Sequence, residues 1–77
     1  MPYKMSYGKS STPGSVLKAV REAARVTQMT LAVELDVSLR TVQRWEKDEL
    51  TPSAAQVFHL ADYFEIKPRD LVKEEAA

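Results

Sequence analysis

The sequence has no cysteine and a single histidine, His59. Without thiols it cannot form disulfides or a thiolate zinc site, and one imidazole cannot build a multi-histidine metal site. We therefore expect no metal ion and no cofactor. No apolar run approaches the roughly 18 residues that a membrane span requires, and residues 1–10 lack the apolar centre of a signal peptide. These absences predict a soluble cytoplasmic protein with no membrane partner.

Glycine is also scarce. Both glycines fall within residues 1–14, so no glycine-rich loop is available to hold a phosphate group. A chain of 77 residues has too little material for a pocket shielded from water, and it offers only one imidazole as a general base. We therefore do not expect an enzyme.

Charge, by contrast, is plentiful and unevenly distributed. Basic and acidic residues number 11 each, so the formal net charge is zero. Residues 1–44 carry seven basic and three acidic side chains, whereas residues 45–77 carry four basic and eight acidic ones. A chain polarised in this way can present a basic face to a polyanion even though its net charge is zero.

The chain divides into three parts by composition. Residues 1–14 hold both glycines, two prolines and four Ser or Thr residues, which predicts a flexible N-terminal arm. Residues 15–73 show a helical spacing of apolar side chains and no sustained alternation, which predicts one all-α domain of five short helices. Residues 74–77 form a short tail.

Hydroxyl side chains mark the expected helix starts. The predicted N-caps are Ser15, Thr27, Ser38 and Ser53. Gln56, three residues after the last of these, completes a capping box, and Pro68 suits the first position of a final helix that ends at about Lys73. We expect the core to contain the large apolar residues Leu31, Leu35, Val37, Val42, Trp45, Phe58, Leu60, Phe64 and Ile66.

Residues 28–47 form the most informative segment. Two predicted helices are joined by residues 36–38, and the small residue Ala32 stands where the second helix would cross the first. The second helix places Val42 and Trp45 on one side and cationic side chains on the other. This arrangement is the helix-turn-helix plan, in which the outer face of the second helix enters the major groove of DNA.

The same segment resembles the Cro/phage-repressor-type (XRE-like) helix-turn-helix family. The residues at the family's spacings are Gln28, Ala32, Leu35, Val37, Val42, Trp45 and Glu46, and the resemblance extends from roughly Leu17 to Leu71. It implies a lambda-repressor-like fold of five short helices. It also implies double-stranded DNA as the partner.

The resemblance assigns roles to individual side chains. It places Ser38, Leu39, Arg40, Gln43 and Arg44 toward DNA bases, and Gln28, Thr41 and Lys47 toward phosphates. Arg21 and Glu46 match a structural ion pair of the family. Two simpler interpretations remain open. Leu39 also has the spacing to pack inward with Val42, and Arg40 and Arg44 also suit an ordinary solvated helix face.

The predicted function is therefore a nucleoid-associated transcriptional regulator. We expect a repressor that binds a partly palindromic operator as a homodimer, with the helix at about 38–47 in the major groove. The expected dimer surface comprises Phe64, Ile66, Leu71 and Val72. The alternative is an antitoxin-type or adaptor module that uses the same fold to bind a protein partner.

The sequence departs from the family pattern in two ways. Arg25, Asp36 and Glu65 stand after helices where the family usually has glycine, which adopts the left-handed conformation of a helix end without strain. The loop after the predicted DNA-reading helix is acidic, with Asp48 and Glu49. Two carboxylates near phosphates would weaken DNA binding unless the loop turns away from the duplex.

Overall fold

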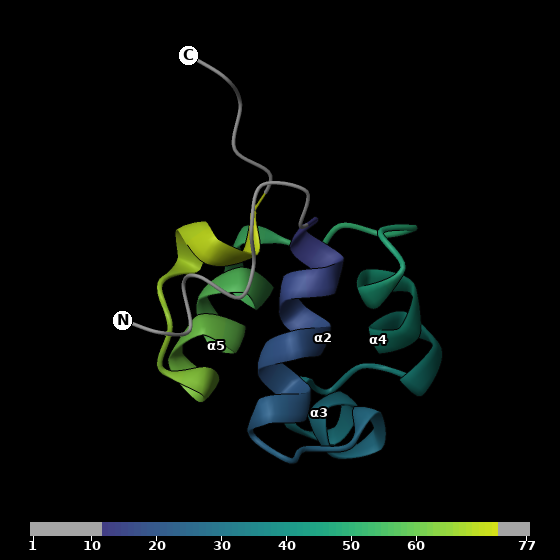
Figure 1. Cartoon of the computed structure of the whole chain (residues 1–77). Helices are drawn as coiled ribbons and strands as arrows, with labels where there is room; N and C mark the ends of the chain where they lie inside the picture. The colour runs from purple at the N-terminus through teal and green to yellow at the C-terminus, as the bar shows by residue number, and fades with distance from the viewer. Residues whose placement is uncertain (1–11, 73–77) are drawn as a thin grey trace.

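The computed structural model describes residues 12–72, and every regular element in that range is helical. The elements are α2 (Pro13–Ala23), α3 (Gln28–Leu35), α4 (Leu39–Glu46), α5 (Ala54–Phe64) and the 3-10 helix η1 (Pro68–Leu71) (Figure 1). The all-α prediction is confirmed, with four α-helices and one 3-10 helix. The last element is therefore tighter and shorter than the expected helix to Lys73.

Side-chain caps begin the four α-helices. The hydroxyls of Thr27, Ser38 and Ser53 accept bonds from the backbone N–H three residues on, as predicted. The prediction of Ser15 as a cap is wrong, because Thr12 caps α2 and Ser15 returns the bond in a capping box. The physical reason is Pro13, whose fixed φ suits the first helical position and starts the helix early.

This earlier start has a consequence for the predicted arm. Its last three residues, 12–14, form the cap and the first turn of α2. The rest of the predicted arm and the tail at 74–77 lie outside the described residues. The domain therefore includes residues 12–14, while the arm before them and the tail stay predictions.

Each α-helix is followed by a non-glycine residue in the left-handed conformation. The φ angles are 60° at Arg25, 57° at Asp36, 61° at Asp48 and 59° at Glu65. After each, the next N–H donates to a carbonyl five residues earlier, as Val37 does to Ala32 at 2.9 Å, which satisfies the helix end. The left-handed conformation costs roughly 1–2 kcal/mol for such residues.

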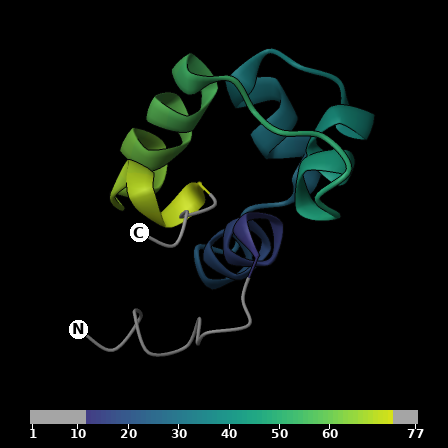
Figure 2. The same ribbon diagram turned by 90° about the horizontal axis from the view of Figure 1, so that it is seen from above.

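The core lies between two pairs of elements. Seen from above, α5 and η1 lie on one side and α3 and α4 on the other, with α2 next to both (Figure 2). The buried apolar residues are Val16, Leu17, Val20, Leu31, Ala32, Leu35, Val42, Trp45, Val57, Leu60, Ala61 and Leu71. No helix among residues 12–72 has the length and apolar character needed to cross a membrane.

The predicted core needs one clear correction. Phe58 is 62% exposed. The inward face of α5 is lined by Val57, Leu60 and Ala61, and Phe58, one residue after Val57, is turned about 100° away from Val57 around the helix axis. Val37, Phe64 and Ile66 are only partly buried and pack against the edge of the core.

Candidate nucleic-acid interface

The turn between α3 and α4 sets the geometry of the candidate interface. Asp36 takes the left-handed conformation, and Val37 N–H then donates to the carbonyl of Ala32 at 2.9 Å. The buried methyl group of Ala32 lets α3 and α4 pack closely together. These contacts hold the two helices as a helix-turn-helix pair.

Helix α4 has two chemically different faces. Val42 and Trp45 are buried in the core, while Arg40 and Lys47 are exposed and Gln43 and Arg44 are partly exposed. The burial of one face fixes which side chains the other presents. The outward face is therefore cationic and rich in hydrogen-bond donors.

The start of α4 holds the other predicted contact residues. Ser38 is exposed, while Leu39 and Thr41 are partly buried. The hydroxyl of Ser38 accepts from Thr41 N–H at 3.1 Å and lies 3.0 Å from the Thr41 hydroxyl. These two side chains thus engage each other at the helix cap. Leu39 lies at the boundary between the core and the outer face.

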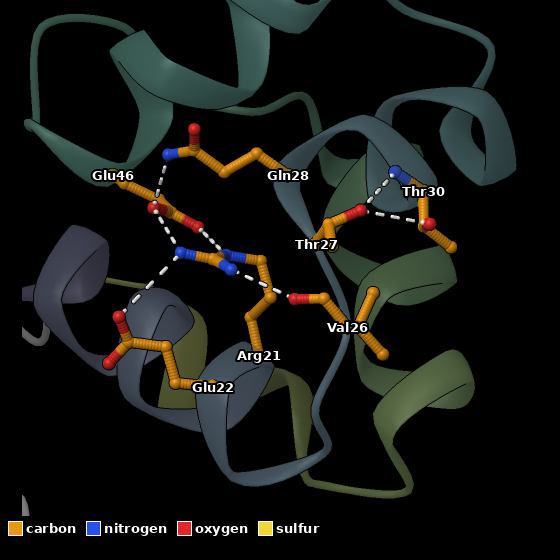
Figure 3. Close-up of polar contacts among 7 residues, drawn as sticks. All are labelled: Arg21, Glu22, Val26, Thr27, Gln28, Thr30 and Glu46. Atoms are coloured by element: carbon orange, nitrogen blue, oxygen red, sulfur yellow. Dashed lines mark hydrogen bonds and ion pairs between the residues drawn. The ribbon is translucent and has the colours of Figure 1, made fainter.

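Arg21 and Glu46 form a buried ion pair between α2 and α4 (Figure 3). Arg21 Nε lies 2.5 Å from Glu46 Oε2, and Nη2 lies 3.2 Å from Oε1. Arg21 Nη1 also donates to the carbonyl of Val26 at 2.8 Å. The side chains are only 10% and 4% exposed, so this two-pronged contact is shielded from water and sets the orientation of the end of α4.

Gln28 joins this network rather than standing alone at the start of α3. Its Nε2 donates to Glu46 Oε1 at 2.9 Å (Figure 3). The amide nitrogen carries two hydrogens, and this bond uses one of them. Sequence reasoning placed Gln28 toward a phosphate but missed its contact with Glu46, since residues 18 positions apart give no local signal of their proximity.

The two carboxylates of the acidic loop after α4 have different neighbours. Asp48 Oδ2 accepts from the Thr12 hydroxyl at 2.6 Å, and Oδ1 accepts from Gly14 N–H at 2.9 Å. Asp48 therefore points to the N-terminus of α2, where the helix dipole favours a negative charge. Glu49 instead lies beside α4, with Oε1 4.0 Å from Arg44 Nε.

Other kinds of site find little support among residues 12–72. No group of three or more metal-ligating side chains occurs in that range. A hollow of about 410 Å³ lies between the first turn of α2, the loop after α4 and α5, and its lining includes Leu17, Trp45 and Leu60. The cationic face of α4 therefore remains the principal candidate site.

Two comparisons with known proteins give matches. Residues 17–71 match the helix-turn-helix family. Among solved structures, the P22 c2 repressor protein in complex with a synthetic operator superposes with a TM-score of 0.78 and 23% sequence identity. The alignment covers 86% of this chain and 100% of that one. The search of curated proteins gives no match.

Proposed function

This chain belongs to the helix-turn-helix family of the Cro/phage-repressor type, whose members are DNA-binding regulators rather than enzymes, and from this premise we propose that it is a transcriptional repressor. In this proposal it acts in the cytoplasm at the nucleoid as a homodimer on a partly palindromic operator. Each subunit places α4 in one major groove, and two-fold symmetry places the two helices about 34 Å apart.

The observation that carries the proposal is the two-faced structure of α4. Its inner face is buried at Val42 and Trp45, which leaves the cationic face free to enter a groove about 12 Å wide. In the proposed complex, the arginines at 40 and 44 bind guanine, Gln43 binds adenine, and Leu39 contacts a thymine methyl group. Ser38 lies at the start of the same face and reaches a base edge.

Contacts to the DNA backbone would set the register of this helix. Gln28 lies at the N-terminus of α3, and the second hydrogen of its amide is directed to a phosphate in our proposal while Glu46 holds the first. Thr41 and Lys47 would bind phosphates that flank the groove. Helix N-termini favour phosphate because their N–H groups and dipole both attract anions.

The homodimer would use the exposed apolar side chains of the C-terminal half. Of the expected dimer residues, Leu71 is buried and Phe64 and Ile66 are partly buried, so only Val72 offers its surface freely. Leu50 and Phe58 are the other large apolar residues exposed in this half. We therefore assign the dimer surface to Leu50, Phe58 and Val72.

The protein-interaction alternative loses one of its arguments. The acidic loop favoured an antitoxin-type or adaptor module, but Asp48 is turned to the N-terminus of α2. This orientation reduces the charge conflict between the loop and DNA. We therefore retain the repressor as the single proposed function.

A selection from random duplex DNA near physiological salt tests the proposal. A two-fold-symmetric motif, with log affinity falling steeply against log salt, is the expected result for a dimer that neutralises phosphates. Sedimentation equilibrium of the complex would give two chains per site. Weak binding without a motif would contradict the proposal and favour the protein-interaction alternative.

Arg44→Ala then tests the assignment of α4. We expect operator affinity to fall by about 5- to 150-fold, which corresponds to the loss of one base contact. The free energy of unfolding should change by less than about 0.5 kcal/mol because the side chain is partly exposed. Lys18→Ala is the matched control, since it removes a cation from the exposed face of α2. Equal effects of the two substitutions would refute the assignment.

A further inference from the structure

The two carboxylates of the loop after α4 differ in what neutralises them. Asp48 accepts two hydrogen bonds at the N-terminus of α2, one from a hydroxyl and one from a backbone N–H. Among residues 12–72, Glu49 has a single charged neighbour, Arg44, at 4.0 Å; the Glu49 side chain is 57% exposed and that of Arg44 is 44% exposed. The charge of Asp48 is thus compensated within the fold, whereas that of Glu49 is compensated by a side chain of the proposed DNA-reading face.

The turn at Asp48, which follows α4, holds Glu49 next to Arg44. The left-handed conformation of Asp48 reverses the chain, and Glu49 N–H donates to the carbonyl of Arg44 at 2.9 Å. The carboxylate of Asp48 then ties this turn to Thr12 and Gly14. Backbone and side-chain contacts therefore fix the position from which the Glu49 side chain reaches Arg44.

We propose that Glu49 is a positioning residue that lowers DNA affinity by competing with DNA for the guanidinium of Arg44. This inference rests on the proposed function. An arginine that binds a base or phosphate must orient its donors toward the duplex. Glu49 draws the same guanidinium back toward the loop, so binding requires this contact to be exchanged. Asp48 does not compete because its oxygen atoms are already engaged at α2.

Glu49→Gln and Asp48→Asn form a matched pair of tests, since each removes one negative charge from adjacent positions and keeps the side-chain shape. We expect Glu49→Gln to tighten operator binding by up to about fivefold at low salt, the upper end of the range for an exposed ion pair. The gain should shrink as salt is raised. Asp48→Asn should change the affinity by less than about twofold, because asparagine can still accept from Gly14 and contact Thr12.

The same substitutions in an Arg44→Ala background separate competition from simple repulsion. If Glu49 acts through Arg44, Glu49→Gln gives less than about a twofold gain when Arg44 is absent. If the carboxylate merely repels phosphates, the full gain persists in that background, which would overturn the proposal. No gain from Glu49→Gln in the otherwise unchanged protein would also overturn it.

A measurement on the protein without DNA keeps this inference distinct from the proposed function. The NMR signal of the Arg44 Nε–H group should move on Glu49→Gln and stay in place on Asp48→Asn. An unmoved signal in the first variant would refute the contact itself. Failure of the unsubstituted protein to select any DNA motif would instead refute the proposed function, whatever the NMR signal does.

Discussion

Helices α2 and α4 share part of the apolar core and are also held by polar side chains at both ends of their junction, whereas α5 and η1 are joined to the rest of the domain mainly by apolar contacts. The Arg21–Glu46 ion pair and the bonds of Asp48 to the first turn of α2 hold the two ends of the first junction. Leu60 and Leu71 lie in the core at the second. Among residues 12–72, one side-chain hydrogen bond links α5 to another helix, between His59 and the carboxylate of Glu34 at 3.0 Å on the surface.

The difference separates orientation from stability. Hydrogen bonds and ion pairs depend strongly on angle and distance, so they fix the orientation of α4 relative to the core. Burial of apolar surface is non-directional and supplies most of the free energy of folding. The polar contacts of the first junction therefore serve the direction of the proposed DNA-reading helix, and the apolar junction serves the stability of the domain.

The largest effect is expected from breaking the buried ion pair on one side. Arg21→Met leaves the Glu46 carboxylate in a shielded position without its charged partner, which should cost about 3–5 kcal/mol of unfolding free energy. Arg21→Met combined with Glu46→Leu should recover most of that loss, because apolar residues can replace such a pair. Urea denaturation measures both.

The double variant also tests directly whether the polar contacts orient α4 independently of the stability of the domain. It should fold but bind the selected operator more weakly than the original chain, since neither the angle of α4 nor the amide of Gln28 is held any longer. Titration with labelled operator at a temperature well below the melting point measures this. Full operator affinity in a stable double variant would show that the polar junction does not orient the helix.

A smaller loss of stability is expected from a cavity in the apolar junction. Leu60→Ala should lower the unfolding free energy by about 2–5 kcal/mol, since the removed atoms leave an unfilled space. Val33→Ala is the matched control, because Val33 is 73% exposed on α3 and its truncation should matter by less than about 0.5 kcal/mol. Operator affinity per folded molecule should stay unchanged in both. Equal stabilities of the two variants would contradict the division.

The smallest effect is a gain, and it concerns the helix ends in both halves. Glu65→Gly should raise the unfolding free energy by about 1 kcal/mol, because glycine adopts a φ of 59° without strain. This value is a net one, since the greater freedom of glycine in the unfolded chain offsets part of the gain. Asp36→Gly should give less, since aspartate tolerates the left-handed conformation better than glutamate does. Thermal unfolding by circular dichroism ranks the two. A loss of stability in Glu65→Gly would show that this end is not strained.

Most local features of the fold were predictable from the sequence, whereas contacts between distant residues were not, apart from the Arg21–Glu46 ion pair that the family resemblance implied. The caps at Thr27, Ser38 and Ser53 depend on neighbouring residues, so their patterns are visible in the chain. The burial of Trp45 follows from helical spacing in the same way. The three positions that depart from the family's glycines, Arg25, Asp36 and Glu65, indeed adopt positive φ.

The errors have equally physical causes. Phe58 was placed in the core because of its size, although its position on α5 directs it outward. The partners of Asp48 lie 34 and 36 positions earlier in the chain, where no periodicity connects them. The only available signal was the Thr12–Pro13 pair, a cap followed by a favoured first helical residue.

The close approach at Gly14 determines where the smallest folding unit must begin. A Cβ atom there would lie 2.5 Å from the Trp45 carbonyl oxygen and 2.6 Å from that of Glu46, so the first turn of α2 rests directly on the end of α4. A chain shortened to start at Ser15, where the helical apolar pattern begins, would lose this contact between α2 and α4 together with both hydrogen-bond partners of Asp48. Thr12 to Gly14 thus belong to the domain as fully as its core does, and the helix that we propose to read DNA is anchored by residues that precede the helical pattern of apolar side chains.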